Sequence, residues 1–373
     1  MPSLVVLDAV GTPAFVDALR AAWDAGDAVL PVDPRLPAPA RATLLAAMAP
    51  MRPIEDGDAL VVATSGSTGV PKGVVLTHDA VRTSALAVSR RIGVTTSASG
   101  EGRRPDRWLA CLPLAHVGGL AVVARALVTG TPLEVHPSFD PSAVEASAAT
   151  LVSLVPTALR RVDPSRFRVV LVGGSAPPAD LPPNVVATYG MTETGGGVIH
   201  DGVPLDGVEV RVDGTGQLHL RGPMLLRCYR DGSDPKGAGG WLATGDVAEI
   251  GGDGRVRVLG RLDDLIVTGG ENVWPAPVEE VLRSHPGVVD AAVFGRPDPE
   301  WGQRVTALVV PADAASPPSL SALREWVRER LPPFAAPRDV VPVESLPRTA
   351  SGKVRRHALA PALEEWGQPV HDA

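Results

Sequence analysis

Short apolar runs alternate with amphipathic segments through the first two hundred residues of the chain. Apolar side chains recur at helical spacing near the N-terminus, at Phe15, Val16, Leu19, Ala22 and Trp23. Strand-like apolar runs follow at residues 60–63, 108–112, 151–155 and 169–172. Helix-like segments between these runs span residues 79–92 and 118–127. This alternation predicts an α/β domain whose β-sheets are covered by helices.

The pattern changes near residue 208, where short β-rich pieces separated by glycine turns replace the alternation. Further along the chain, helices are predicted at residues 278–284 and 320–331, and strands at 288–294 and 304–310. A tail of about a hundred residues with this content is typical of a small α+β domain. We therefore predict three parts: a large N-terminal domain at 1–260, a hinge at 261–264 and a small mobile C-terminal domain at 265–373.

Composition restricts the classes of function. The chain of 373 residues carries a formal net charge of −7, which excludes a general nucleic-acid binder. Its two cysteines, Cys111 and Cys228, lack the spacing of metal ligands and suggest no disulfide framework. No basic region precedes the apolar residues of the N-terminus, and no apolar run reaches the length of a membrane span. We expect a cytoplasmic enzyme without membrane insertion, and the oligomeric state, including a homodimer, stays open.

The segment TSGSTGVPKG, residues 64–73, combines glycines, hydroxyl side chains and one lysine. Glycines let a ligand approach the main chain, and exposed N–H groups form an anion-binding concavity. The segment is not a Walker A loop, because Pro71, Lys72 and Gly73 stand where Gly-Lys-Ser/Thr is required. A flexible Gly/Ser linker would not explain this P-K-G or the apolar run before it. We predict polyphosphate binding by Thr64, Ser65, Gly66, Ser67, Thr68, Gly69 and Lys72.

Further motifs stand at residues 112–119 (LPLAHVGG), 173–177 (GGSAP), 189–194 (YGMTET), 244–246 (TGD), 260–264 (GRLDD) and 347–354 (PRTASGKV). Together with the glycine-rich loop, and in this order, they resemble the signatures of the adenylate-forming superfamily. That superfamily includes acyl-CoA synthetases, luciferases and the adenylation domains of peptide synthetases. The resemblance departs at residues 24–37, which look like a segment that lies much deeper in the family's sequences. The N-terminal domain is therefore expected to be shortened at its N-terminus, and the layout of its outer sheet stays open.

The resemblance implies roles for individual residues. Thr192 would contact the α-phosphate, Glu193 would help to hold Mg²⁺, and Lys353 would be the catalytic lysine of adenylate formation. The adenine and ribose would be bound by Gly174, Ser175, Ala176, Tyr189, Gly190, Met191, Asp246 and Arg261. Rotation about the hinge residue Asp263 would present a second loop to a thiol. This loop on the CoA side comprises Gly269, Gly270 and Glu271.

The implied activity is that of an acid–CoA ligase that uses ATP, Mg²⁺ and coenzyme A. A carboxylate is a poor acyl donor, so it is first joined to AMP with release of pyrophosphate. The acyl-adenylate then reacts with the thiol of CoA. Positioning of the reactants and stabilisation of the developing charge are the protein's contribution to such a transfer.

The acid is indicated by the segment GGLAVVARAL, residues 118–127. An arginine in such an apolar helix favours an anion as partner, although Arg125 could also extend to solvent. The H-V-G-G…R pattern is similar to that of the o-succinylbenzoate–CoA ligases of menaquinone biosynthesis. We therefore predict o-succinylbenzoate as the substrate and His116, Arg125 and Gly190 as its contacts, with His116 as a pocket wall or carboxylate contact.

Three alternatives stay open. A CoA ligase or stand-alone adenylating enzyme of the same mechanism could act on another aryl or short-chain carboxylic acid. A non-catalytic acyl- or nucleotide-binding module would be favoured by loss of Lys353 or Glu193, and both residues are present. A phosphotransferase with a degenerate phosphate loop would release ADP, whereas the ligase releases AMP and pyrophosphate.

Overall fold

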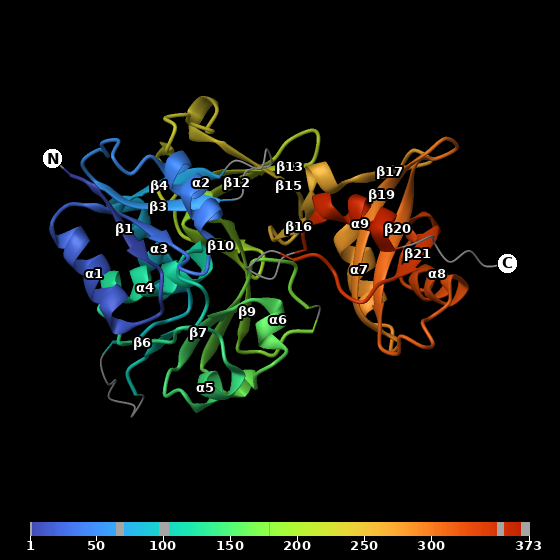
Figure 1. The fold of residues 1–373 in the computed structure, drawn as a ribbon, viewed down its shortest axis with the longest axis horizontal. Coiled ribbons are helices and arrows are strands. Elements are labelled where there is room, and N and C mark those ends of the chain that lie inside the picture. Colours follow the sequence, from blue (N-terminus) through green and yellow to red (C-terminus); the bar gives the residue numbers. More distant parts are fainter. Residues whose placement is uncertain (1, 65–70, 97–103, 179, 349–353, 367–373) are drawn as a thin grey trace. The chain divides into compact units, whose positions relative to one another are not determined.

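The computed structural model describes residues 2–64, 71–96, 104–178, 180–348 and 354–366 (Figure 1). Two compact units divide the chain. The first unit comprises Met1–Arg211, His219–Ala243 and Gly252–Val256, and the second comprises Val212–Leu218, Thr244–Gly251 and Arg257–Ala373. The domain limits at residues 260 and 265, with a hinge between them, stay a prediction.

The outer sheet of the first unit, which the sequence left open, has five strands in the order β1-β2-β3-β4-β14. They are β1 (Leu4–Asp8), β2 (Ala28–Val32), β3 (Asp58–Thr64), β4 (Lys72–Thr77) and β14 (Cys228–Tyr229). The pairs β1–β2 and β2–β3 are parallel, whereas β4 runs antiparallel to β3 and to β14. Helices α1 (Pro13–Asp24) and α2 (Ala38–Met48) pack against this sheet. The loop of residues 64–73 thus connects two paired strands.

The second sheet of this unit has seven strands in the order β11-β10-β9-β8-β7-β5-β6. They are β5 (Trp108–Ala110), β6 (Leu133–Val135), β7 (Leu151–Leu154), β8 (Val169–Val172), β9 (Val185–Met191), β10 (Gly196–His200) and β11 (Val203–Pro204). Strands β5 to β9 are parallel to their neighbours, and β10 is antiparallel to β9. Short helices α5 (Pro141–Ala146) and α6 (Pro156–Leu159) connect some of these strands. The strands predicted from apolar runs are confirmed.

Two helices, α3 (His78–Arg91) and α4 (Val117–Thr129), contact strands of these two sheets. Helix α3 packs against β3 and β4, and α4 packs against β5 and β7. The two helices also pack on each other. Helix α4 is apolar on nearly all sides, as expected for a helix buried among other elements. The predicted helices at 79–92 and 118–127 are confirmed, and Arg125 lies within this buried helix.

A four-stranded sheet in the order β12-β13-β15-β16 contributes residues to both units. Its strands are β12 (Glu209–Val212), β13 (Gln217–Arg221), β15 (Leu242–Ile250) and β16 (Val256–Arg261). Glycines with positive φ occupy the turns around these strands, for example Gly216 and Gly254. This is the glycine-punctuated β pattern that the sequence showed from residue 208.

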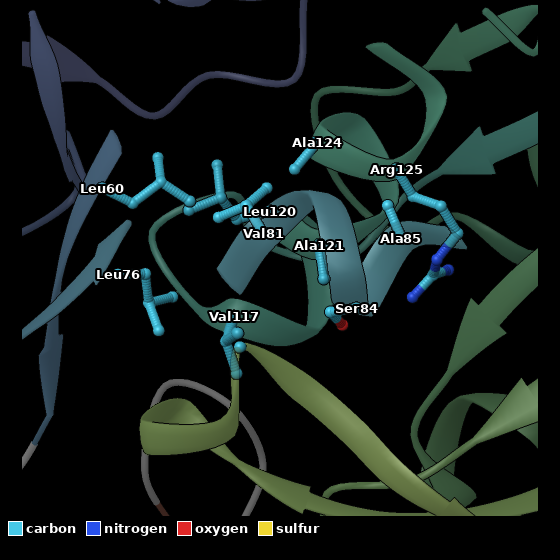
Figure 2. A pocket seen from close by; sticks show the side chains of 11 residues that line it. Leu60, Leu76, Val81, Ser84, Ala85, Val117, Leu120, Ala121, Ala124 and Arg125 are labelled. Atoms are coloured by element: carbon cyan, nitrogen blue, oxygen red, sulfur yellow. The ribbon is translucent and has the colours of Figure 1, made fainter. Parts of the chain in front are cut away.

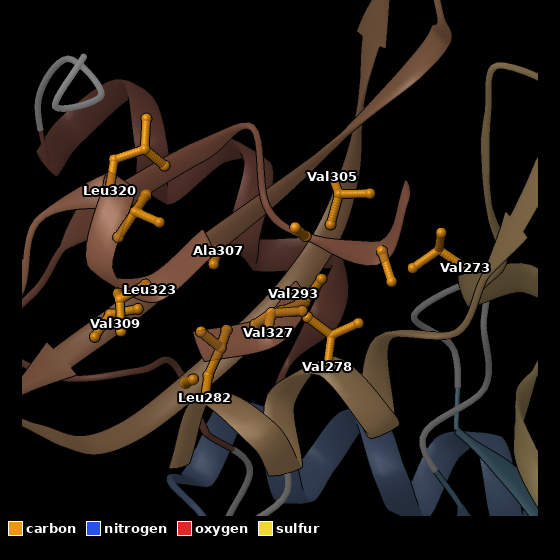
Figure 3. Close-up of a cluster of buried hydrophobic side chains, with 14 of the residues drawn as sticks. Val273, Val278, Leu282, Val293, Val305, Ala307, Val309, Leu320, Leu323 and Val327 are labelled. Carbon is orange, nitrogen blue, oxygen red and sulfur yellow. The ribbon is translucent and has the colours of Figure 1, made fainter. Parts of the chain in front are cut away.

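The rest of the second unit is a small α+β fold (Figure 3). Its strands are β17 (Ile266–Thr268), β18 (Glu271–Val273), β19 (Val288–Asp298), β20 (Gly302–Pro311) and β21 (Asp339–Pro342). Helices are α7 (Pro275–Arg283), α8 (Leu320–Arg328) and α9 (Leu359–Trp366). Side chains of α7 and α8, such as Leu282 and Leu323, bury one face of the sheet at Val293 and Val309. The predicted α/β fold with a small α+β C-terminal domain is confirmed.

Across the part of the chain that the structure describes, no helix is both long enough and apolar enough to cross a membrane.

Candidate active site

Three of the predicted motifs lie at or directly after the carboxyl ends of parallel strands in the seven-stranded sheet. The segment with His116 follows β5, and the segment with Ser175 follows β8. Tyr189 lies within the C-terminal part of β9, and Thr192 directly follows this strand. Parallel strands end at one edge of a sheet, which is where open α/β sheets bind ligands. The hydroxyl of Thr188 donates to the carbonyl of Val172 at 3.1 Å and ties two of these ends together.

Backbone packing holds the YGMTET segment in one conformation. Gly190 pairs with Gly197 across β9 and β10, and a Cβ on Gly190 would lie 1.9 Å from the carbonyl oxygen of Gly196. The 3₁₀ turn Thr192–Thr194 follows, and the buried hydroxyl of Thr194 donates to the carbonyl of Gly196 at 2.6 Å. A side chain at Gly190 is therefore excluded, and the turn has a fixed start and end.

The two ends of the predicted phosphate-binding segment are paired. Thr64 lies opposite Lys72 in the β3–β4 ladder, and its hydroxyl donates to the carbonyl of Lys72 at 3.4 Å. Five predicted phosphate contacts lie outside the described residues, namely Ser65, Gly66, Ser67, Thr68 and Gly69. The catalytic candidate Lys353 also lies outside them.

Tyr229 connects Lys72 with Glu193, two residues that were selected from different motifs. The phenol of Tyr229 donates to Oε1 of Glu193 at 3.0 Å, and Nζ of Lys72 lies 5.0 Å from the centroid of the Tyr229 ring. Burial, followed by the negative charge of Glu193, raises the pKa of Tyr229, so its hydroxyl stays a donor. Tyr229 was not predicted from the sequence. The only hint is that it is one of two tyrosines in the chain and lies in the short polar segment RCYRDG, residues 227–232.

Glu193 fits a magnesium ion that is shared with a nucleotide. No group of three or more His, Cys, Asp or Glu side chains within the described ranges could hold a metal ion without help. Mg²⁺ usually keeps several waters and binds through one or two carboxylates together with substrate phosphates. A single carboxylate that Tyr229 links to Lys72, a predicted phosphate contact, is therefore a suitable donor set.

Arg125 is buried without a full set of partners. Its side chain is 6% exposed, and its Cζ lies 4.7 Å from the centroid of the Trp108 ring. Nε and Nη1 have no hydrogen-bond partner among the residues that the structure describes. Burial lowers the pKa of Arg125 to about 10, so the guanidinium remains charged at neutral pH. Arg125 therefore does not extend to solvent, and it offers two donors to an anion.

Arg125 lies at one end of a narrow apolar cavity, with Leu60 and Leu76 at the other end (Figure 2). The cavity is lined by Leu60, Leu76, Val81, Ser84, Ala85, Val117, Leu120, Ala121, Ala124, Arg125 and Gly195. Its space of about 20 Å³ is that of roughly one water molecule. An aromatic acid could reach Arg125 by this route only after neighbouring side chains rearranged.

Two histidines lie near helix α4: His116 at its N-terminus and His200 on the neighbouring strand β10. His116 is the N-cap residue of α4, and its charge would add to the effect of Arg35, which is the main cause that lowers the pKa of Asp33. His200 is 2% exposed on β10. Burial is the main cause that lowers the pKa of His200 to about 3, and the charge of Arg125 contributes. His200 is therefore neutral at physiological pH.

The second unit brings the two predicted ribose contacts together. Nη1 of Arg261 lies 3.3 Å from Oδ1 of Asp246 and donates to the carbonyl of Thr244 at 3.1 Å. Gly245 adopts a φ of 74°, and a Cβ there would lie 2.8 Å from Nη2 of Arg261. The TGD glycine thus leaves space for the arginine beside the carboxylate.

The predicted CoA-side residues form a tight turn in the second unit. Gly269 and Gly270, both with positive φ, connect β17 to β18, and the amide of Gly269 donates to the carbonyl of Trp301 at 2.8 Å. Asp263 lies in the 3₁₀ turn Leu262–Asp264, and the neighbouring Asp264 forms an ion pair with Arg356 at 3.0 Å. A role for these residues as hinge and CoA contacts stays a prediction.

Comparison with known proteins identifies the class. A family model described as AMP-binding enzyme matches residues 48–230, and a second, described as AMP-binding enzyme C-terminal domain, matches residues 277–353. These matches, with the fold, place the protein among the adenylate-forming, AMP-binding enzymes. A probable 2-succinylbenzoate–CoA ligase from Mycobacterium tuberculosis is 41% identical over 345 residues, which cover 85% of this chain and 88% of the relative. The chain belongs to the family of 2-succinylbenzoate–CoA ligases.

Solved structures of similar fold carry informative ligands. The o-succinylbenzoate CoA synthetase from Bacillus subtilis, in complex with its acyl-adenylate intermediate, matches with a TM-score of 0.82 at 26% identity, over 96% of this chain and 88% of that one. A further structure of that synthetase contains ATP and a magnesium ion. An amide bond synthetase from Marinactinospora thermotolerans matches with a TM-score of 0.81 at 25% identity, over 97% of this chain and 90% of that one.

Proposed function

We propose that this protein joins 2-succinylbenzoate to coenzyme A at the expense of ATP, through an acyl-adenylate, with release of pyrophosphate and AMP. Family membership and the related synthetase structures support this reaction. The product, o-succinylbenzoyl-CoA, belongs to menaquinone biosynthesis. Because ATP and CoA are the co-substrates, we also propose that the enzyme acts in the cytoplasm. A homodimer remains an open alternative to a monomer.

The observation that carries the choice of acid is the buried Arg125. A guanidinium with two free donors beside an aromatic ring is costly to keep unless an anion pairs with it. 2-Succinylbenzoate has two carboxylates, and the aliphatic one is the expected reaction centre. The aromatic carboxylate must then be bound without being activated, and a charge-assisted bond with Arg125 suits that task.

In this proposal each remaining residue binds, orients or stabilises. Lys72 and the loop from Thr64 bind the β- and γ-phosphates, and Thr192 contacts the α-phosphate. Asp246 and Arg261 bind the ribose, which offers two hydroxyl donors to a carboxylate. The adenine is bound by Gly174, Ser175, Ala176, Tyr189, Gly190 and Met191. A magnesium ion held in part by Glu193 would neutralise phosphate charge in the first step.

The two half-reactions use different surfaces of the second unit. Lys353 would stabilise the charge that develops during adenylation. Rotation about Asp263 would then withdraw Lys353 and bring Gly269, Gly270 and Glu271 to the thiol of CoA. His116 and Gly190 would border the acyl group.

The direct test is a screen of acid-dependent pyrophosphate exchange over a panel of mono- and dicarboxylic acids, followed by mass analysis of the product with CoA or with simple amines. We expect exchange to be strongest with 2-succinylbenzoate, and a CoA thioester as the product. Exchange that favours a monocarboxylic acid would reject the substrate. An amide product without thioester would instead favour the chemistry of the similar amide bond synthetase.

Arg125→Ala should raise the KM for 2-succinylbenzoate strongly and leave the KM for ATP nearly unchanged. Removal of one partner from a buried charge pair costs about 2–5 kcal/mol, which is roughly thirtyfold or more in KM. Arg125→Lys should restore binding only in part, because an ammonium cannot reproduce the guanidinium fork. Steady-state kinetics should compare 2-succinylbenzoate with its analogue that lacks the ring carboxylate.

The matched control is Arg82→Ala, which removes an exposed arginine from the neighbouring helix α3. It should leave both KM values unchanged. If Arg125→Ala weakens both acids by the same factor, or if the wild-type enzyme uses them equally well, Arg125 does not read the second carboxylate.

A further inference from the structure

Tyr229 makes contacts that neither the motifs nor the family comparison assign. Its hydroxyl donates to Oε1 of Glu193 at 3.0 Å, and the ammonium of Lys72 lies 5.0 Å from the centre of its ring. Lys72 begins β4 in the outer sheet, whereas Glu193 lies in the 3₁₀ turn after β9 of the seven-stranded sheet. Their side chains therefore need a shared contact to keep a constant spacing. The side chain of Tyr229 contacts both.

The backbone around Tyr229 is fixed on both sides. Strand β14 pairs with β4, where Tyr229 lies opposite Val74, and the amide of Arg230 donates to the carbonyl of Gly73 at 2.6 Å. On the other side, the amide of Leu226 donates to the carbonyl of Glu193 at 2.7 Å. One short segment is thus bonded to the residue after Lys72 and to Glu193 itself.

The chemistry of a tyrosine suits this position. A phenol O–H donates one charge-assisted bond to a carboxylate and so orients it, while leaving the second carboxylate oxygen for another ligand. The face of the ring attracts a cation, which favours the ammonium of Lys72 above it. A phenylalanine would keep the second interaction and lose the first.

We propose that Tyr229 is a positioning residue that sets the Glu193 carboxylate and the Lys72 ammonium at a fixed spacing for magnesium-bound ATP. The proposal rests on the proposed function, because it takes Glu193 as a magnesium contact and Lys72 as a phosphate contact. Tyr229 itself touches neither the metal nor the reacting atoms. Residues that orient a metal ligand by hydrogen bonding typically contribute 10- to 100-fold in metal affinity.

The test measures binding rather than turnover. A non-hydrolysable ATP analogue with a methylene bridge between its α- and β-phosphates is titrated by calorimetry at a series of Mg²⁺ concentrations. For Tyr229→Phe we expect the Mg²⁺ concentration that supports half-maximal binding to rise on the order of tenfold. Affinity for AMP, which needs neither Lys72 nor the metal, should stay at the wild-type value. Tyr229→Leu should show the same shift and, in addition, weaker binding of the analogue at saturating Mg²⁺.

Cys228→Ala is the matched control, because Cys228 is the other residue of β14 and its side chain packs with the apolar cluster of the outer sheet. It should leave the Mg²⁺ dependence unchanged. An unchanged Mg²⁺ dependence in Tyr229→Phe, or an equal shift in Cys228→Ala, would overturn the proposal. If the wild-type protein itself binds the analogue without any effect of Mg²⁺, the proposed function fails at its first step, which is a different outcome from failure of Tyr229 alone.

Discussion

Arg125 in the first unit and Glu279 in the second unit are both buried charges, and they differ in their partners. Glu279 is 4% exposed and forms ion pairs with Arg356 at 2.9 Å and with Arg283 at 3.2 Å. Arg125 is 6% exposed, and within the described part of the chain two of its nitrogens have no partner. Its nearest compensation is the ring of Trp108. The fold thus provides ion-pair partners for Glu279 and leaves two nitrogens of Arg125 without hydrogen-bond partners in the described part of the chain.

We interpret this difference as one of purpose. Glu279 has its partners within the folded chain, whereas Arg125 is proposed to find its partner in the substrate. A buried ion pair adds little net stability, yet removal of one partner is strongly destabilising because the other is left unpaired. The opposite is expected for a buried charge that already lacks partners. Its removal should not lower the free energy of unfolding, because it relieves a desolvation cost. Stability measurements can therefore distinguish the two cases without any substrate.

The largest expected effect is on stability. Glu279→Gln should lower the free energy of unfolding of the second unit by up to about 3–5 kcal/mol, because Arg356 and Arg283 each lose one of their two charged partners and keep only Asp264 and Asp290. Arg125→Met should leave the first unit equally stable or more stable. Urea unfolding of both variants, followed by tryptophan fluorescence, gives the comparison. Equal destabilisation by the two substitutions would mean that Arg125 is as well compensated as Glu279.

The next largest effect is on the rate of adenylation. It compares Lys353 with the paired charges of the second unit. The residues that flank Lys353 are held by ion pairs, Arg348 with Asp290 and Arg356 with Asp264. Lys353→Ala should slow adenylation by about 10²–10³-fold through loss of charge stabilisation, with the free energy of unfolding unchanged. Thioester formation from a supplied acyl-adenylate should be largely spared. Equal loss in both half-reactions would contradict the division of labour between the two steps.

The smallest effect is a dependence of stability on pH in the first unit. The pKa of His200 is about 3 in the folded chain, against 6.5 for an ordinary histidine. Below pH 6.5 the unfolded chain takes up a proton that the folded chain rejects, so stability falls as the pH decreases towards 3. At pH 5 the loss is on the order of 2 kcal/mol, and it fades to nearly zero about one pH unit above 6.5.

His200→Gln should flatten this profile, as measured by urea unfolding between pH 4 and pH 8. The exposed His357 supplies the control, His357→Gln, which reports the effect of losing a histidine elsewhere. A wild-type slope that persists in His200→Gln would assign the pH dependence to another group.

Part of the site could be read from the sequence because its signals are local. Arg125 stood out as a charge in an apolar run, and the glycines of residues 64–73 stood out by density. Tyr229 did not, because its partners Lys72 and Glu193 come from distant segments and only the fold brings them together.

For the fold, too, local features could be predicted from the sequence and long-range pairing could not. The helices α3 and α4 follow from their periodicity, whereas the outer sheet could not be laid out in advance. Its strand β2 is a five-residue buried run, AVLPV, that carries no alternation to show which neighbours it pairs with. Parallel pairing of β2 with β1 and β3 is a long-range property of the chain.

The pairing of β14 with β4 also has a consequence for how the chain is made. Nε of Arg230 donates to the carbonyl of Met48 at a separation of 182 residues, and Met48 packs in the apolar cluster of the outer sheet. At a typical rate of synthesis, roughly 10–40 s pass between the emergence of these two positions from the ribosome. Strand β4 lacks its partner β14 for most of this interval. Where the rest of the outer sheet has already formed, β4 is then an unprotected edge, open to pairing with other chains. The outer sheet, which carries the glycine-rich segment of residues 64–73, is thus among the last parts of the first unit to be completed, although that segment is among the first to be synthesised.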